Sequence, residues 1–183
     1  MAGIFNEAVL TTKGIALLAK AQAGECTIEL TKAASGSGSY DDDDDLQSMT
    51  ALKNQQQEFD ITGVYTQNET NVYVKFIITN NPDSGALTTG YYVTEVGIFA
   101  TDPDEGEILY AIATAIEDQW DYMPSYNSYL PATITVEFLI EVSNASEVTI
   151  VALNQTYVYD TSDGTKYVIG VEDGVLYYEE VDE

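Results

Sequence analysis

Alternation of apolar and polar residues is the strongest pattern in this sequence, and it is typical of half-buried β-strands. It is clearest in "ATITVEFLIEV", residues 132–142. Successive side chains of a strand point to opposite faces of a sheet, so one face of this segment is expected to be buried and the other wet. The apolar face consists of Ile134, Val136, Phe138, Ile140 and Val142.

Further short runs rich in β-branched and aromatic residues follow one another from Phe59 onward. They include "FDITGVY", "NVYVKFIIT", "YYVTEVGIFA" and "EILYAIATA", and they are separated by "TQNET", "NNPDSG" and "TDPDEG". Asn, Pro, Asp and Gly form turns for steric reasons, so each separator ends one strand and starts the next. The sequence therefore predicts an α+β fold that is predominantly antiparallel β.

The N-terminal segment has the pattern of one amphipathic helix followed by a strand. Thr11 and Thr12 both suit the N-cap of a helix with the body "KGIALLAKAQA", and Gly24 suits the left-handed position after it. Alternation resumes over residues 26–31. We expect this N-terminal helix to pack on a β-sheet or sandwich. The apolar face of the helix would hold Leu10, Leu17, Leu18 and Ala21.

A Gly/Ser stretch then leads into five consecutive aspartates, Asp41, Asp42, Asp43, Asp44 and Asp45. This acidic loop, about residues 35–45, lacks the alternate ligands, the central glycine and the closing Glu of a calcium loop, so no metal site is predicted. Two readings remain open, a solvated run and an electrostatic docking element for a basic surface. Residues 46–57 after it predict a short helix, with Leu46, Met49 and Leu52 on one side.

The C-terminal part contains two further strand predictions. After the turn "SNAS", the segment "EVTIVAL" is expected to form an antiparallel hairpin with residues 132–142. The Tyr-rich tail reads as a small three-stranded β-meander, with Asp173-Gly174 as a two-residue turn. We therefore expect a main domain over residues 1–153 and the meander over residues 154–183.

Composition excludes several classes of function. The chain has 31 Asp and Glu against 6 Lys and Arg, a net charge of −25, which disfavours nucleic acid and membrane surfaces as partners. It has no His, which removes the commonest general base and zinc ligand. Glu95 and Glu137 remain as a carboxylate pair for glycoside hydrolysis, but carboxylates on the wet face of a sheet are far commoner. We predict no cofactor and no enzyme.

The segment "EDQWDYMPSYNSYLP" interrupts the strand pattern with prolines and aromatic residues. Exposed aromatic side chains of this kind contact protein partners or stack on sugars. A lid folded over the core of the domain is the other reading of the same residues. The candidate contacts are Trp120, Tyr122, Tyr126 and Tyr129.

Three segments, in order, resemble the N-terminal domain of phage tail-collar fibre proteins. They are "AVLTTKGIALLAKAQAGE", "TEVGIFATDPDEGEILYAIATA" and "ATITVEFLIEVSNASEVTIVAL", and the resemblance covers about residues 8–153. The positions that match the motifs of this family are Leu10, Thr11, Lys13, Gly14, Glu95, Gly97, Ile98, Phe99 and Asn144. For Gly97, a glycine inside a strand also predicts close approach of another backbone.

The resemblance implies a structural protein of the phage virion, which joins a tail fibre to the baseplate. Long fibres of this family continue well beyond this domain, so the short Tyr-rich segment after it favours a short fibre or an adaptor at the tail tip. The implied partners are baseplate and tail-fibre proteins, with a homotrimer as the expected oligomer and assembly in the host cytoplasm. The alternative is a carbohydrate-binding module that uses the aromatic segment to recognise the host surface.

Overall fold

The structure is a computed structural model, and it describes residues 5–41, 43–67, 71–82, 84–141, 150–152, 156–159, 166–172 and 175–180. Two compact units are present, Met1–Ala152 and Leu153–Glu183. Antiparallel strands make up most of the described residues, together with one α-helix, which confirms the predicted α+β class. The elements of the first unit are β1 Val9–Leu10, α1 Thr12–Gln22, β2 Ile28–Gly36, the 3₁₀ turn η1 Leu46–Ser48, β3 Gln55–Phe59, β4 Ile61–Gln67, β5 Asn71–Thr79, β6 Tyr91–Val93, β7 Glu95–Asp102, β8 Gly106–Thr114, β9 Asp121–Met123, β10 Thr133–Glu141 and β11 Ile150–Ala152.

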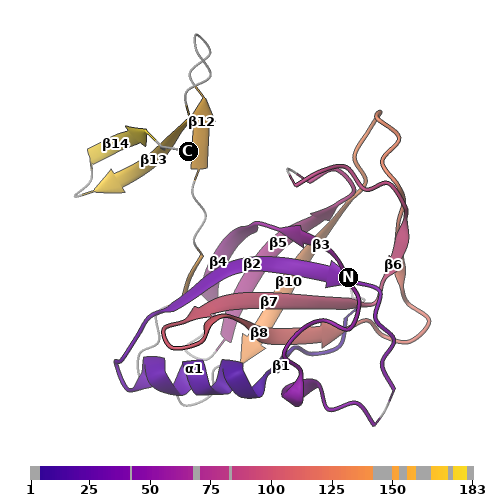
Figure 1. Cartoon of the computed structure of the whole chain (residues 1–183), viewed down its shortest axis with the longest axis horizontal. Coiled ribbons are helices and arrows are strands. Elements are labelled where there is room, and N and C mark those ends of the chain that lie inside the picture. Colours follow the sequence, from indigo (N-terminus) through magenta and orange to yellow (C-terminus); the bar gives the residue numbers. More distant parts are fainter. Residues whose placement is uncertain are drawn as a thin grey trace. The chain divides into compact units, whose positions relative to one another are not determined.

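The central sheet has the strand order β1-β8-β7-β2-β11, and β3 also pairs with β2 (Figure 1). β7 and β8 form an antiparallel hairpin in which Asp102 lies opposite Gly106. Gly106 has a φ of 80°, a left-handed conformation that glycine adopts without steric cost, so the chain can turn tightly here. β2 pairs antiparallel with β7, which brings Gly36 opposite Glu95.

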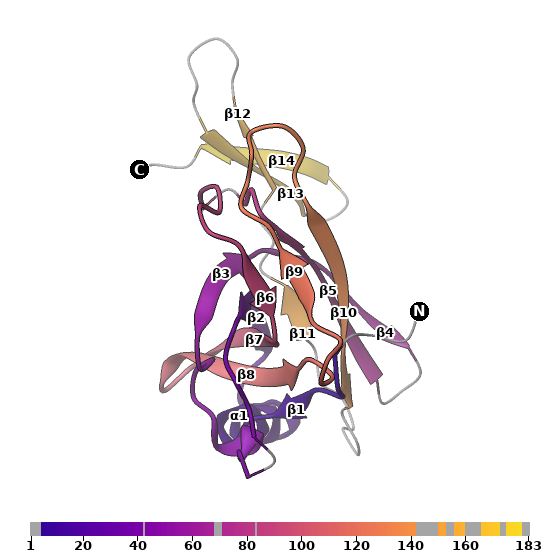
Figure 2. The ribbon, with the colours of Figure 1, turned by 90° about the vertical axis from the view of Figure 1, so that its right-hand side faces the viewer.

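A second sheet has the order β10-β5-β4 and faces the central sheet across the core (Figure 2). β10 and β5 pair antiparallel, and their inward apolar side chains lie opposite one another and are buried. This match explains why the alternating segment at residues 132–142 folds where it does, because both strands bury their apolar face against the same core. The opposed pairs are Val136 with Phe76, Phe138 with Val74, and Ile140 with Val72.

β11 corrects one of the predictions from the sequence. An antiparallel hairpin with β10 was expected, but Ile150–Ala152 pairs in parallel with β2, Ile150 opposite Ile28. β10 takes β5 as its neighbour instead, because nine residues of matched apolar alternation bury more surface than a three-residue strand offers. The residues of the predicted turn, 143–146, lie outside the described part of the chain.

α1 begins and ends as its sequence indicates. Thr11 is the N-cap, and Gly24 takes the left-handed conformation that ends the helix, with a φ of 75°. The buried face contains Leu17 and Ala21 and packs on β8, while Leu18 is half-buried. One N-terminal helix packed on a sheet is therefore confirmed.

A helix over residues 46–57 was also predicted, and this prediction is wrong. Only the 3₁₀ turn Leu46–Ser48 is helical, and β3 begins at Gln55. Leu52 is buried in a small second cluster with Phe99 and Leu109, on the face of the central sheet away from the main core. The backbone amides of the next two residues bind the side chain of Glu95, which prevents them from continuing a helix.

The second unit is an antiparallel three-stranded meander of the predicted kind. It consists of β12 Thr156–Tyr159, β13 Lys166–Glu172 and β14 Val175–Glu180, in the order β12-β13-β14. Val175 of β14 lies opposite Glu172 of β13. The Asp173-Gly174 dipeptide that was predicted to form the turn between these strands lies outside the described residues.

Candidate functional site

The start of α1 is fastened to β8 through Thr11. Its hydroxyl accepts a hydrogen bond from Gly14 N at 3.0 Å and donates one to the carbonyl of Leu109 at 2.5 Å. Its backbone N–H donates to the Tyr110 carbonyl at 3.0 Å. A Cβ atom on Gly14 would lie 2.1 Å from that Tyr110 oxygen, so only glycine lets the helix approach β8 this closely. Thr11 and Gly14 thus set the position of the helix.

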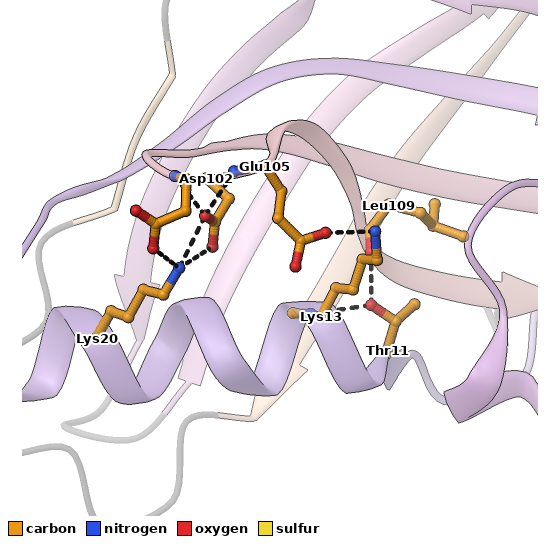
Figure 3. A network of polar contacts seen from close by, with 8 residues as sticks. Thr11, Lys13, Lys20, Asp102, Glu105 and Leu109 are labelled. Carbon is orange, nitrogen blue, oxygen red and sulfur yellow. Dashed lines mark hydrogen bonds and ion pairs between the residues drawn. The ribbon is translucent and has the colours of Figure 1, made fainter.

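Two lysines on α1 bind acidic residues of the turn between β7 and β8 (Figure 3). Lys20 Nζ lies 2.8 Å from both carboxylate oxygens of Asp102 and 2.8 Å from Asp104 Oδ2. Lys13 Nζ lies 2.5 Å from Glu105 Oε2. Asp102 is buried, and the hydrogen bond from Lys20 lowers the pKa of its carboxyl. These contacts hold the face of α1 that carries Lys13 and Lys20 to the turn between β7 and β8.

Glu95 is fully buried and binds two neighbouring loops at once. Its Oε1 accepts hydrogen bonds from the backbone amides of Gly38 at 2.9 Å and Asn54 at 2.8 Å. Its Oε2 accepts from the amide of Lys53 at 2.9 Å and from the Tyr40 hydroxyl. Burial and the hydrogen bond with Glu95 raise the pKa of Tyr40. Glu95 therefore acts as a structural anchor for loops on both sides of the acidic run.

The rest of the second motif packs in the sheet. Ile98 is fully buried in the main core, and Phe99 belongs to the second cluster. Close approach of another backbone was expected at Gly97, but its nearest neighbours are side chains. A Cβ there would lie 2.8 Å from Leu109 Cδ1 and 3.0 Å from Leu52 Cδ2, so the missing side chain makes room for the second cluster.

The motif positions from Leu10 to Phe99 thus lie on β1, on α1 and its N-cap, and on β7, and several are inward-facing or hydrogen-bonded to neighbouring segments. Leu10, in β1, lies opposite Ala111 of β8. Asn144 lies outside the described residues. Thr11, Gly14, Glu95, Gly97, Ile98 and Phe99 take part in the packing and hydrogen bonds of the first unit.

Exposed aromatic side chains gather where β6 pairs with β9. Tyr92 and Tyr122 lie opposite each other in this two-stranded sheet, with ring centroids 5.0 Å apart. The rings of Trp120 and Tyr92 form a T-shaped pair with centroids 6.3 Å apart. About half of each side chain is exposed: 54% for Tyr92, 53% for Tyr122 and 47% for Trp120. We call these three residues the aromatic patch.

The structure brings together only part of the predicted aromatic set. Tyr129 is 88% exposed and lies outside the ring contacts of the aromatic patch, while Tyr126 is half-buried with its amide bound to the Leu87 carbonyl. Tyr92 was missed, since it precedes the segment by many residues, although its strand-like surroundings were recognised. The other interpretation of residues 117–131 was a lid over the core. Met123 is the residue of this segment that is buried in the main core.

The last two residues of the aspartate run, Asp44 and Asp45, bind neighbouring residues. Asp44 lies 2.5 Å from Lys53 Nζ and accepts a hydrogen bond from the amide of Asp41, and the bond from Lys53 lowers its pKa. Asp45 caps η1 by accepting from Gln47 N at 3.1 Å. Asp41, Asp43 and Asp45 are exposed, and Asp42 lies outside the described residues. Docking through this run stays a prediction.

Little in the described residues resembles a reaction centre. The Glu95 carboxylate accepts four hydrogen bonds. Glu137 lies on the other sheet, where it is half-exposed, and its Oε1 is 3.7 Å from Lys75 Nζ. Among the residues described, no group of three acidic or Cys side chains is placed to hold a metal ion. No helix in that part of the chain has the length and apolarity needed to cross a membrane.

A comparison with protein families gives a match over most of the chain. A family model described as phage tail-collar fibre protein, N-terminal, matches residues 1–163. The match includes all the motif positions named above and extends past the first unit at Ala152. Searches of curated proteins and of solved structures give no match.

Proposed function

Because the chain belongs to the phage tail-collar fibre protein family, and is thus a structural component of the virion tail, we propose that it attaches a fibre to the baseplate or acts as a short fibre or adaptor at the tail tip. The observation that carries the proposal is the family match over residues 1–163. The buried positions of the shared motifs support it, because they build a compact domain rather than a reaction centre.

The first unit is the part that binds the baseplate in this proposal. The aromatic patch is its candidate contact, because exposed Tyr and Trp side chains contribute large contact areas at protein interfaces. The meander, Leu153–Glu183, contacts another subunit. A homotrimer assembled in the host cytoplasm is the expected form, with baseplate and fibre proteins as partners, and the net charge of −25 disfavours nucleic acid and membranes.

Purified phage particles test the location. Mass spectrometry of washed particles should detect the chain in amounts comparable with other tail proteins, and immunogold labelling should mark the tail tip. Absence of the chain from the particles would refute the proposal. Label on the tail tube or the capsid would refute the placement at the tip.

The contact itself is tested with Trp120→Ala. This variant should fold but be incorporated less efficiently into particles, because it removes part of an exposed patch. Tyr65→Ala is the matched control, since Tyr65 is also a half-exposed aromatic residue but lies on β4 in the other sheet. Equal incorporation of both variants at the wild-type level would rule out the aromatic patch as a baseplate contact.

A carbohydrate-binding role is the second candidate, and the geometry of the aromatic patch favours it as an alternative. Three adjoining exposed rings offer faces on which a sugar can stack. Glycan-array binding that is lost in Trp120→Ala but kept in Tyr65→Ala would support this role. If no glycan binds the wild-type chain, recognition of the host surface by this patch is refuted.

A further inference from the structure

A groove of ≈ 620 Å³ separates β10 from the N-terminal segment that leads into β1. Most of its lining comes from two runs of consecutive residues, Phe5–Ala8 and Ile134–Leu139, and the rest from Tyr73, Ala113 and Asp121. Neighbouring residues of a strand point to opposite faces, so a wall of consecutive residues is formed by the edge of the strand, with its backbone groups. The groove therefore runs along the edge of β10, beside the N-terminal segment, which among its described residues has strand-like pairing only at the bridge of Phe5.

β10 and the N-terminal segment are not paired with each other among the described residues. β10 is the end strand of its sheet, and its neighbour is β5. The N-terminal segment instead contacts the end of β8, through the bridge between Phe5 and Ala115, the residue after β8, and the hydrogen bond from Asn6 N to the Thr114 carbonyl at 2.9 Å. A second, smaller groove continues between β10 and the N-terminal segment, beside Val9 and Leu10.

β10 has few of the features that protect an edge strand. End strands usually carry Lys or Pro or are kept short, because their free N–H and C=O groups otherwise pair with other chains. β10 has nine residues, "TITVEFLIE", with neither Lys nor Pro, and its charged residues are Glu137 and Glu141. Apolar side chains along the groove are also partly exposed, since Phe5, Ala8 and Ile134 pack on the core but are only partly buried.

We infer that this groove accepts an extended segment of a partner chain as an added β-strand next to β10, and that this segment carries Lys or Arg. In this mode of recognition the main-chain hydrogen bonds give affinity, and the alternate side chains of the added strand give specificity. The identity of the partner as a tail protein rests on the proposed function, whereas the strand addition rests on the groove alone.

Charge selects a basic partner over a second copy of this chain. The acidic residues that line the groove are Glu7, Asp121 and Glu137, and no Lys lines it. A second copy would bring its own net charge of −25 to the same surface. Like charges brought together at an interface are costly, while a basic segment is attracted. A homo-oligomer would therefore use another surface.

Model peptides test the inference on the full-length protein. The first probe alternates Lys with Val over about nine residues, the length of β10, and its control alternates Glu with Val. The Lys–Val peptide should bind and slow amide exchange across residues 133–140, and its affinity should fall as salt is raised. The inference is overturned if neither peptide protects β10 at millimolar concentration, or if the Glu–Val peptide protects it equally.

Paired substitutions localise the interaction. Glu7→Gln combined with Glu137→Gln should weaken binding of the Lys–Val peptide about fivefold, from the loss of exposed charge pairs. Glu25→Gln combined with Asp43→Asn removes the same charge from exposed positions elsewhere and should leave the affinity within about twofold. Equal weakening by both pairs would overturn the assignment to this groove.

Zero-length carboxylate–amine cross-linking of purified particles addresses the partner. A cross-link from Glu7, Asp121 or Glu137 to a lysine of a different tail protein is expected. If the chain is in the particle but these residues join only lysines of its own sequence, the heterologous partner is overturned while the proposed function stands. If the chain is absent from the particle, the proposed function fails, and the peptide experiment alone decides on strand addition.

Discussion

The ammonium of Lys20 in the last turn of α1 is held 2.8 Å from both carboxylate oxygens of Asp102 at the end of β7. This contact lowers the pKa of Asp102, so the unfolded chain takes up the proton at a higher pH than the folded chain does. The stabilisation is therefore complete above the unfolded pKa and is lost as the pH falls through the lower, folded pKa.

Asp102→Asn tests this linkage. The variant should unfold more easily than wild type at neutral pH, and the difference should shrink below about pH 3.8, the ordinary pKa of the group. The difference between the two proteins is the quantity to follow, because 31 acidic residues titrate in both. Asp43→Asn is the control at an exposed position. A pH-independent difference would contradict the linkage.

Glu95→Gln should destabilise the first unit by about 3 kcal/mol, because an amide NH₂ would replace one of two oxygens that both face N–H or O–H donors. Urea unfolding measures the loss. The matched control is Glu137→Gln, which removes the same charge at a half-exposed position and should cost less than about 1 kcal/mol. Similar losses in the two variants would show that Glu95 does not anchor its loops.

Elements whose signal is local could be predicted from the sequence. Thr11 and Gly24 bound α1 because capping depends on a few neighbouring residues, and β10 follows from its own alternation. The partner of β11 could not be predicted, because strand pairing depends on which distant surfaces match. The helix expected over residues 46–57 failed for the same reason, since Glu95, far away in the sequence, binds the amides of Lys53 and Asn54.

In the candidate site, too, local features could be predicted from the sequence and contacts between distant residues could not. Trp120 and Tyr122 stand out in the sequence as aromatic residues in a polar, proline-containing segment. Tyr92 joins them only because β6 pairs with β9, and short strands of three residues give too little periodicity to predict their pairing. The groove beside β10 was not foreseen either, because a free edge becomes visible only when the order of all strands in the sheet is known.

Tyr110→Phe is expected to stabilise the protein. The Tyr110 hydroxyl is fully buried and has no hydrogen-bond partner among the described residues, and burial raises its pKa. Removing an unsatisfied buried hydroxyl while keeping the ring should raise the free energy of unfolding by about 1 kcal/mol. Thermal unfolding would show this as a higher Tm. A clear loss of stability would mean that the hydroxyl is hydrogen-bonded in solution.

The aspartate run can be divided into its anchored and free members. Asp41→Asn with Asp43→Asn should leave folding unchanged or slightly stabilise it, because both side chains are exposed among like charges. Asp44→Asn should cost a measurable amount, since it removes the ion pair with Lys53. If the free members dock on a basic surface, particle assembly will become less sensitive to salt in the first variant, whereas a solvated run leaves that sensitivity unchanged.

Gly14→Ala provides the sharpest test of how α1 is seated. Inside a helix, alanine is intrinsically favoured over glycine by up to about 1 kcal/mol, so a free helix would be stabilised. Here the new Cβ would lie 2.1 Å from the Tyr110 carbonyl oxygen, and either the helix or β8 must move. We expect the steric strain to outweigh the higher helix propensity of alanine, so the free energy of unfolding measured in urea should fall by about 1–3 kcal/mol. Gly63→Ala is the control, because among the described residues no atom beyond its two chain neighbours lies within 4 Å of its added Cβ, and it should change stability by less than about 1 kcal/mol. A Gly14→Ala variant as stable as Gly63→Ala would show that α1 is not held against β8 as closely as the structure has it.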